Sequence, residues 1–214
     1  MSMPPGRDRP RRPAHLSLEA MTKYAGTTPG PAEVTEVAHH SAAIVLGVGR
    51  TVADPDVTAR LVALVDELGL DTIAELWSVM PAGTLPGALW RLYALREWVG
   101  RSPTTASREY AAGMRHAQVN HVVAGPAEPP GPDELRALVD EILRRVYRGD
   151  LAVALERAAA FCRVISAGRA ELAHDTDAYD PQLATRETEQ AATLLTTARD
   201  LDAAAAAWRA GALL

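Results

Sequence analysis

Apolar residues recur every three or four positions along most of this 214-residue chain after Pro31, which is the spacing that lets an α-helix bury one side. The alternating pattern of a half-buried strand, bounded by hairpin signals, is missing. Asp54-Pro55 and Asp180-Pro181 each place a capping residue before a proline, an arrangement that favours the start of a helix. The sequence therefore predicts an all-α fold, a single bundle of seven or eight helices.

The first thirty residues differ from the rest in composition. Arginine and proline dominate residues 6–13, and a segment of this kind cannot bury an apolar surface. We therefore expect a disordered basic leader over residues 1–30, followed by a single helical domain over residues 31–214. Residues 124–131 contain three prolines and two glycines, and eight residues is an ordinary length for a loop inside one domain.

The pattern also predicts individual helices. In chain order they cover residues 34–48, 55–68, 71–80, 85–99, 103–123, 135–146, 151–165, and a last segment that begins after Asp180-Pro181. In the last helix alanine alternates with larger residues on the apolar side, which lets a neighbouring helix approach closely. That neighbour is expected within the bundle rather than across a subunit interface.

The helix expected at residues 85–99 is the most informative segment, because it has two apolar faces. Its leucines and Val99 form one stripe, and Trp90, Ala94 and Trp98 form a second stripe on the opposite side. Such a helix is either the centre of a bundle or a core helix that offers its second face to a partner. Aromatic stripes at helical spacing are usually core, which favours the first interpretation. Under the second, Trp77 extends the contact surface.

Charge and cysteine content limit the classes of function. The net charge is −5, and because residues 1–31 contain five basic and two acidic side chains, the remainder carries −8. An acidic body argues against binding to nucleic acid through the phosphate backbone. One cysteine, the lack of a secretory segment and the lack of an apolar run of about 18 residues predict a cytoplasmic protein that does not contact a membrane.

Two Glu-x-x-His steps are the strongest hint of an enzyme. Glu36 with His39, and Glu171 with His174, resemble the helical ligand pairs of di-iron carboxylate proteins. That site needs two further glutamates from other helices, and all four residues fall on the side away from the apolar stripe of their helix. Signatures of phosphate, hydrolase and zinc sites are missing. We therefore expect no metal and no cofactor, with these four residues as the weak candidates for a metal-dependent bundle enzyme.

A helix-turn-helix is the second alternative, over residues 105–124 with Gly113 in its turn. Glu109 stands where that motif wants a small residue, and only Arg115 and His116 would provide basic contacts. One continuous helix through Gly113 explains the same residues, since Tyr110, Met114 and Ala117 keep one register. The continuous helix is favoured over the DNA-binding regulator.

The run Leu85-Pro86-Gly87-Ala88-Leu89-Trp90-Arg91-Leu92-Tyr93, together with residues 151–157, resembles small all-helical actinobacterial proteins of unassigned function. The resemblance implies a cytoplasmic bacterial protein and no catalytic residue. Some of these proteins are named as RNA polymerase subunits, a description that these residues do not support. The leading hypothesis is a non-enzymatic interaction or adaptor protein that binds an unknown protein partner, or itself, through Trp77, Trp90, Ala94 and Trp98.

Overall fold

A computed structural model describes residues 30–46, 73–117, 122–125, 129–147 and 151–213. The contacts divide the chain into residues Met1–Val34 and Thr35–Leu214. Residues 1–29 of the predicted leader and the predicted helix at 55–68 lie outside the described residues. The second of these units spans the proline- and glycine-rich segment at 124–131.

The described residues form helices and contain no strand, so the all-α class is confirmed. Two short helical segments, residues 73–78 and 122–124, accompany the long ones. The long helices are α2 (Pro31–Val45), α4 (Leu85–Arg101), α5 (Pro103–Met114), α7 (Pro132–Tyr147), α8 (Leu151–Asp177) and α9 (Pro181–Arg209). None of the helices in the described ranges combines the length and apolar character that a membrane span requires.

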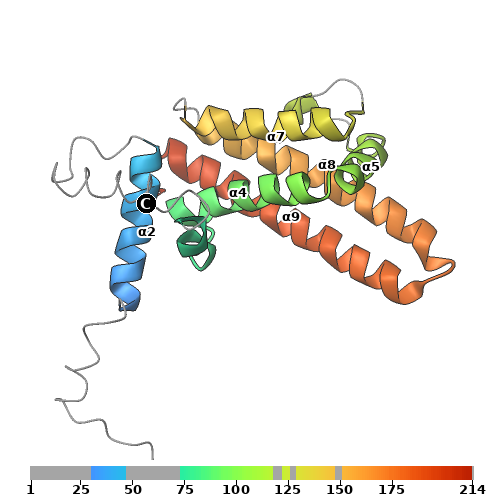
Figure 1. The fold of residues 1–214 in the computed structure, drawn as a ribbon, viewed down its shortest axis with the longest axis horizontal. Coiled ribbons are helices and arrows are strands. Elements are labelled where there is room, and N and C mark those ends of the chain that lie inside the picture. The colour runs from blue at the N-terminus through green and yellow to red at the C-terminus, as the bar shows by residue number, and fades with distance from the viewer. Residues whose placement is uncertain (1–29, 47–72, 118–121, 126–128, 148–150, 214) are drawn as a thin grey trace, which may run out of the picture. The chain divides into compact units, whose positions relative to one another are not determined.

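The centre of the second unit is α8, which forms a long antiparallel hairpin with α9 (Figure 1). Over residues 151–168 its sequence lacks a continuous polar face, so residues on every side of it are buried. Alanine returns every seven residues on the side of α9 that meets it, at positions 184, 191, 198 and 205, and all four are buried. These small side chains allow close packing, and the Ser166 hydroxyl donates a 2.7 Å hydrogen bond to the carbonyl oxygen of Ala191.

Two glycines bring α5 directly against the same central helix. A Cβ added to Gly168 would lie 2.6 Å from the amide nitrogen of Gly113 and would overlap the carbonyl oxygen of Glu109. At the end of α5, the carbonyl oxygen of Gly113 accepts a 2.9 Å hydrogen bond from the amide of Ala117. The prediction of one helix reaching Val123 is therefore wrong. The helix ends at Met114. Gly113 lies where α5 crosses α8, and the chain turns directly after this crossing.

The two-faced helix is present as α4, with its start where the sequence predicted it. The Thr84 hydroxyl accepts a hydrogen bond from the amide of Gly87, and Pro86 occupies the first turn, so both signals favour a helix beginning at Leu85. Every member of its leucine face is buried: Leu85, Ala88, Leu89, Leu92, Leu95 and Val99. Because α8 and not α4 is enclosed on all sides, the favoured interpretation of α4 as the bundle's central helix is wrong.

Candidate interaction groove

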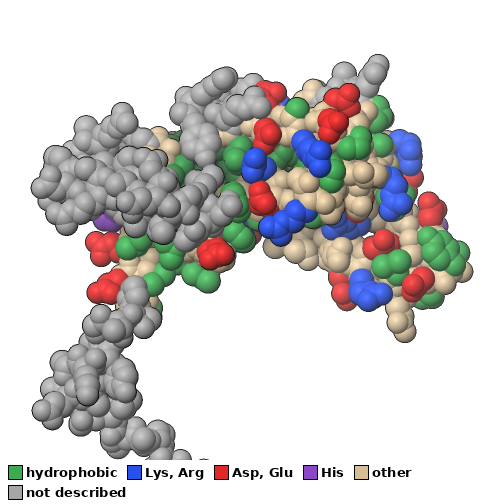
Figure 2. Space-filling model, in the orientation of Figure 1, with side chains coloured by type: hydrophobic (Ala, Val, Ile, Leu, Met, Phe, Trp, Pro, Cys, Tyr) green, Lys and Arg blue, Asp and Glu red, His purple; other side chains and the backbone are tan. Residues whose placement is uncertain are grey.

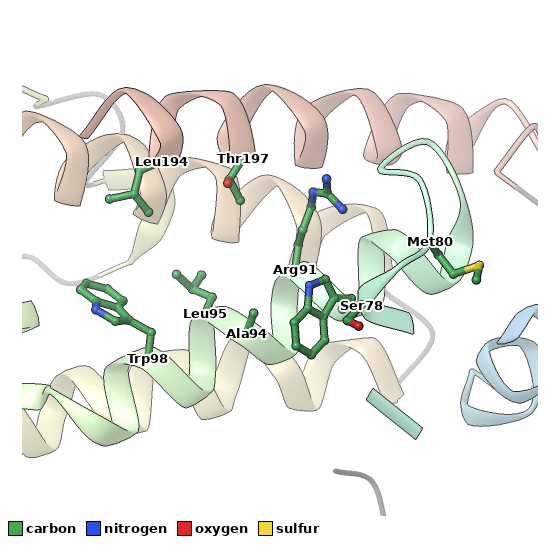
Figure 3. A pocket seen from close by; sticks show the side chains of 9 residues that line it. Ser78, Met80, Arg91, Ala94, Leu95, Trp98, Leu194 and Thr197 are labelled. Carbon is green, nitrogen blue, oxygen red and sulfur yellow. The ribbon is translucent and has the colours of Figure 1, made fainter. Parts of the chain in front are cut away.

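The second face of α4 opens onto a cavity between α4 and α9. The cavity has a volume of about 330 Å³ and opens to solvent. In Figure 3 the side chains of Ala94, Leu95 and Trp98 point from α4 toward Leu194 and Thr197 of α9. The complete lining is Ser78, Met80, Trp90, Arg91, Ala94, Leu95, Trp98, Leu194 and Thr197. We call this space, with its continuation described below, the α4/α9 groove.

An ion pair joins α4 to α9 at one side of the groove. There the Arg91 guanidinium pairs with the Asp200 carboxylate at 3.0 Å and also donates to the carbonyl oxygen of Gly87. Away from this ion pair, α9 turns its alanine side to α8, which leaves Leu194 and Thr197 directed at α4 across an open space. The walls are therefore fixed by packing on their far sides, which makes the groove a preformed feature of the fold.

The groove continues past Trp98, whose ring also lines a second open cavity of about 470 Å³. This part is more polar, and its lining is Trp98, Ser102, Thr105, Glu109, Arg169, Leu183, Arg186, Glu187 and Gln190. On α9 the lining positions 183, 187, 190, 194 and 197 recur with steps of four and three residues, and Arg186 adjoins them. At 1.5 Å per residue this wall is about 21 Å long, or four turns of helix.

Arg169 of α8 connects the groove to the core. Its guanidinium donates to both carboxylate oxygens of Glu109, at 2.9 and 2.8 Å, and lies 5.3 Å from the ring centroid of Trp98. Only 11% of the Arg169 side chain and 7% of the Glu109 side chain are exposed. A bidentate pair shielded to this degree, with a cation stacked on an indole, holds Trp98 in a fixed orientation. Trp98 is thus a rigid part of the groove wall.

The predicted contact residues separate into two groups in the structure. Trp90, Ala94 and Trp98 are half-buried and line the groove together, so the structure brings these three together on one concave surface. Trp77 is only 2% exposed, and its indole N–H donates a 3.0 Å hydrogen bond to the Ser41 hydroxyl. A buried, hydrogen-bonded indole cannot extend an exposed surface. Including Trp77 among the contact residues was therefore wrong.

Several groove residues were not predicted from the sequence. Arg169 and Glu187 carry no motif, and Glu109, the partner of Arg169, comes from a helix far away in the chain. Leu194 was placed on the apolar stripe of the last helix, without any indication that it faces open space. The available signal was on α9, where Glu187 and Gln190 interrupt the spacing that joins Leu183 to Leu194. Polar residues inside an apolar stripe indicate a side that is not packed in a core.

The weak metal candidates do not form one site. Glu36 is exposed on α2, and His39 is half-buried one turn later. Glu171 is occupied by Arg115 at 2.6 Å and by the imidazole Nε2 of His116 at 2.8 Å, and the hydrogen bond from Arg115 lowers the pKa of its carboxyl group. His174 is exposed beyond this cluster. Across the described ranges, no three His, Cys, Asp or Glu side chains gather as metal ligands would.

Reactive side chains are likewise remote from the groove. Cys162 is fully buried on α8, and burial raises the pKa of its thiol to about 12. A thiol protonated at neutral pH and enclosed by packing is a poor nucleophile. Tyr110 is also fully buried, with its ring tilted against that of Phe161 and the ring centroids 5.4 Å apart. The groove itself offers aromatic, aliphatic and charged side chains, a combination suited to binding.

The surface charges of the described residues do not form a basic field on the visible face. Figure 2 shows acidic and basic side chains interspersed over α4, α5, α7 and α9. Arg115 and His116, the two basic contacts considered for a helix-turn-helix, both pair with Glu171. Comparison with protein-family models, with curated proteins and with solved structures yields no match to this chain.

Proposed function

We propose that this protein is a non-enzymatic interaction protein of the cytoplasm, and that its α4/α9 groove accepts a helical segment of another protein. The observation that carries the proposal is the exposure of Trp90, Ala94 and Trp98 to an open cavity, on a helix whose opposite face is fully buried. If these three residues were buried, they would belong to the core. A concave aromatic surface that is open to solvent is instead typical of the centre of an interface.

The shape of the groove favours a helix as its occupant. Two helical walls flank the groove beside the Arg91–Asp200 contact, and the α9 wall extends for about four turns. An amphipathic helix laid between two such walls buries its apolar side at positions i, i+3, i+4 and i+7. Tryptophan and leucine provide the apolar contact, while Arg91 is already neutralised by Asp200.

Neither alternative function is supported at its key residues, although α5 ends close to where a helix-turn-helix would turn. A metal-dependent enzyme needs ligands that converge, and Glu171 is instead paired with Arg115 and His116. A helix-turn-helix needs free basic contacts at the start of its second helix, and these two residues are the same ones that Glu171 engages.

The substitution Ala94→Arg tests the proposal. A long charged side chain at this half-buried position fills the groove without removing a packing group, whereas Trp98→Ala would also release Arg169. We expect a tagged full-length chain to retain a stoichiometric protein from lysate of its own cells, and Ala94→Arg to reduce the amount retained at least about tenfold. Quantitative mass spectrometry of the captured material measures the difference.

Ala137→Arg is the matched control, because Ala137 is exposed on α7 outside the groove. It should retain the protein as the wild type does, and both variants should melt within a few degrees of the wild type. Equal retention by Ala94→Arg would contradict the proposal. Light scattering of the purified chain shows whether the retained partner is a second copy.

A further inference from the structure

We propose that the segment bound in the α4/α9 groove carries a lysine or arginine that pairs with Glu187 of α9. This inference rests on the proposed function and adds the chemistry of the partner. It starts from a single oxygen atom. Glu187 lines the larger cavity of the groove, and its Oε2, which is shielded from solvent, receives no hydrogen bond from the described part of the chain.

A shielded carboxylate oxygen without a donor is unfavourable, because its interactions with water are lost and nothing replaces them. The neighbouring donors are engaged elsewhere. Arg169 gives its Nε and Nη2 hydrogens to Glu109 and reaches Gln190 Oε1 through Nη1 at 3.4 Å. Arg186 also lines this cavity, but it is exposed and keeps its hydration. Glu187 is therefore the charged group with most to gain from a partner.

The surroundings of Glu187 specify what kind of donor fits. Leu183 lies one turn before it on α9, and Trp98 lines the same cavity from α4. Two apolar side chains beside a carboxylate, in an otherwise polar cavity, suit a side chain with a long aliphatic stem and a cationic end, as in lysine and arginine. Glu109 is already paired with Arg169 and Arg186 is exposed, so Glu187 is the carboxylate of this cavity that a cation from the partner would engage.

The experiment uses a displayed library of amphipathic helices of about 14 residues, the length of the α9 wall. The apolar positions are fixed at helical spacing, and the flanking positions vary among Lys, Glu and Gln. Full-length wild type selects the binders, and Ala94→Arg identifies those that need the groove. We expect the groove-dependent binders to share a lysine at one flanking position. Glu187→Gln should weaken these peptides at least about tenfold, and matched peptides with Gln at that position should lose less than twofold.

The outcomes separate the inference from the proposed function. Groove-dependent binders that show no basic preference, or that bind Glu187→Gln as tightly as wild type, overturn the pairing and leave the groove intact as an interface. Binders that ignore Ala94→Arg, or no binders at all, overturn the proposed function and the pairing with it. Competition by the untagged full-length chain would identify a second copy as the occupant and overturn a separate partner. Thermal melting of Glu187→Gln within a few degrees of wild type excludes misfolding as the cause.

Discussion

Among glycine-to-alanine substitutions at the described glycines of α4 and α8, Gly168→Ala should destabilise the protein most. The new Cβ would overlap the carbonyl oxygen of Glu109 and lie 2.7 Å from its carbonyl carbon, so α5 and α8 have to separate. Backbone cannot move aside as a side chain can, and Gly113 stands directly opposite. We expect a loss of at least about 4 kcal/mol, or roughly 8–16 °C in melting temperature.

The same substitution at Gly100 is the matched control. Gly100 is exposed in α4, and an added Cβ meets nothing within 4 Å. Alanine there should stabilise by about 0.5–1 kcal/mol, because glycine loses more backbone freedom on folding. Urea unfolding followed by circular dichroism measures both variants. Equal stability of Gly168→Ala and Gly100→Ala would show that α5 and α8 do not cross at the glycines.

Arg169→Ala should have the second largest effect, a loss of about 3–5 kcal/mol in the free energy of unfolding. The substitution leaves the Glu109 carboxylate, of which 7% is exposed, without the two hydrogen bonds that hold it. It also removes the cation from the face of Trp98. The indole is then less restrained in the groove wall, so its fluorescence anisotropy should fall along with the unfolding midpoint.

Replacing both Glu109 and Arg169 shows whether the stability lost in Arg169→Ala comes from an unpaired buried charge or from lost packing. In the double variant Glu109→Met with Arg169→Met no charge remains buried, and apolar side chains of similar length fill the space. Such replacements are often close to neutral, so most of the stability should return. A double variant as unstable as Arg169→Ala would contradict the account and assign the loss to packing.

The fold was predictable where local chemistry decides the structure. Asp180 before Pro181 defined the start of α9, and the Asp180 carboxylate accepts the amide of Leu183 at 3.0 Å as a capping residue does. The buried leucine face of α4 also followed from its period alone. These features depend on contacts within one or two helical turns, which the sequence displays directly.

The groove was predictable only in part, because distant pairings decide it. The burial of Trp77 could not be predicted, because Ser41, which accepts the hydrogen bond from its indole N–H, is 36 positions away. Glu109 argued against a helix-turn-helix in the sequence. Its ion pair could not be predicted, because its partner Arg169 is 60 positions away. Periodicity shows which side of a helix is apolar, but it does not show which neighbour covers that side.

The central claim is that a protein segment occupies the groove, and photo-crosslinking from position 94 tests it most directly. A benzophenone amino acid replaces Ala94 in one full-length variant and Ala137 in another, and both are irradiated in the cells that make the protein. We expect the side chain at 94, inside the apolar groove, to form a covalent adduct with one protein and the exposed side chain at 137 to form none. The same adduct from both positions, or no adduct from position 94, would contradict the account.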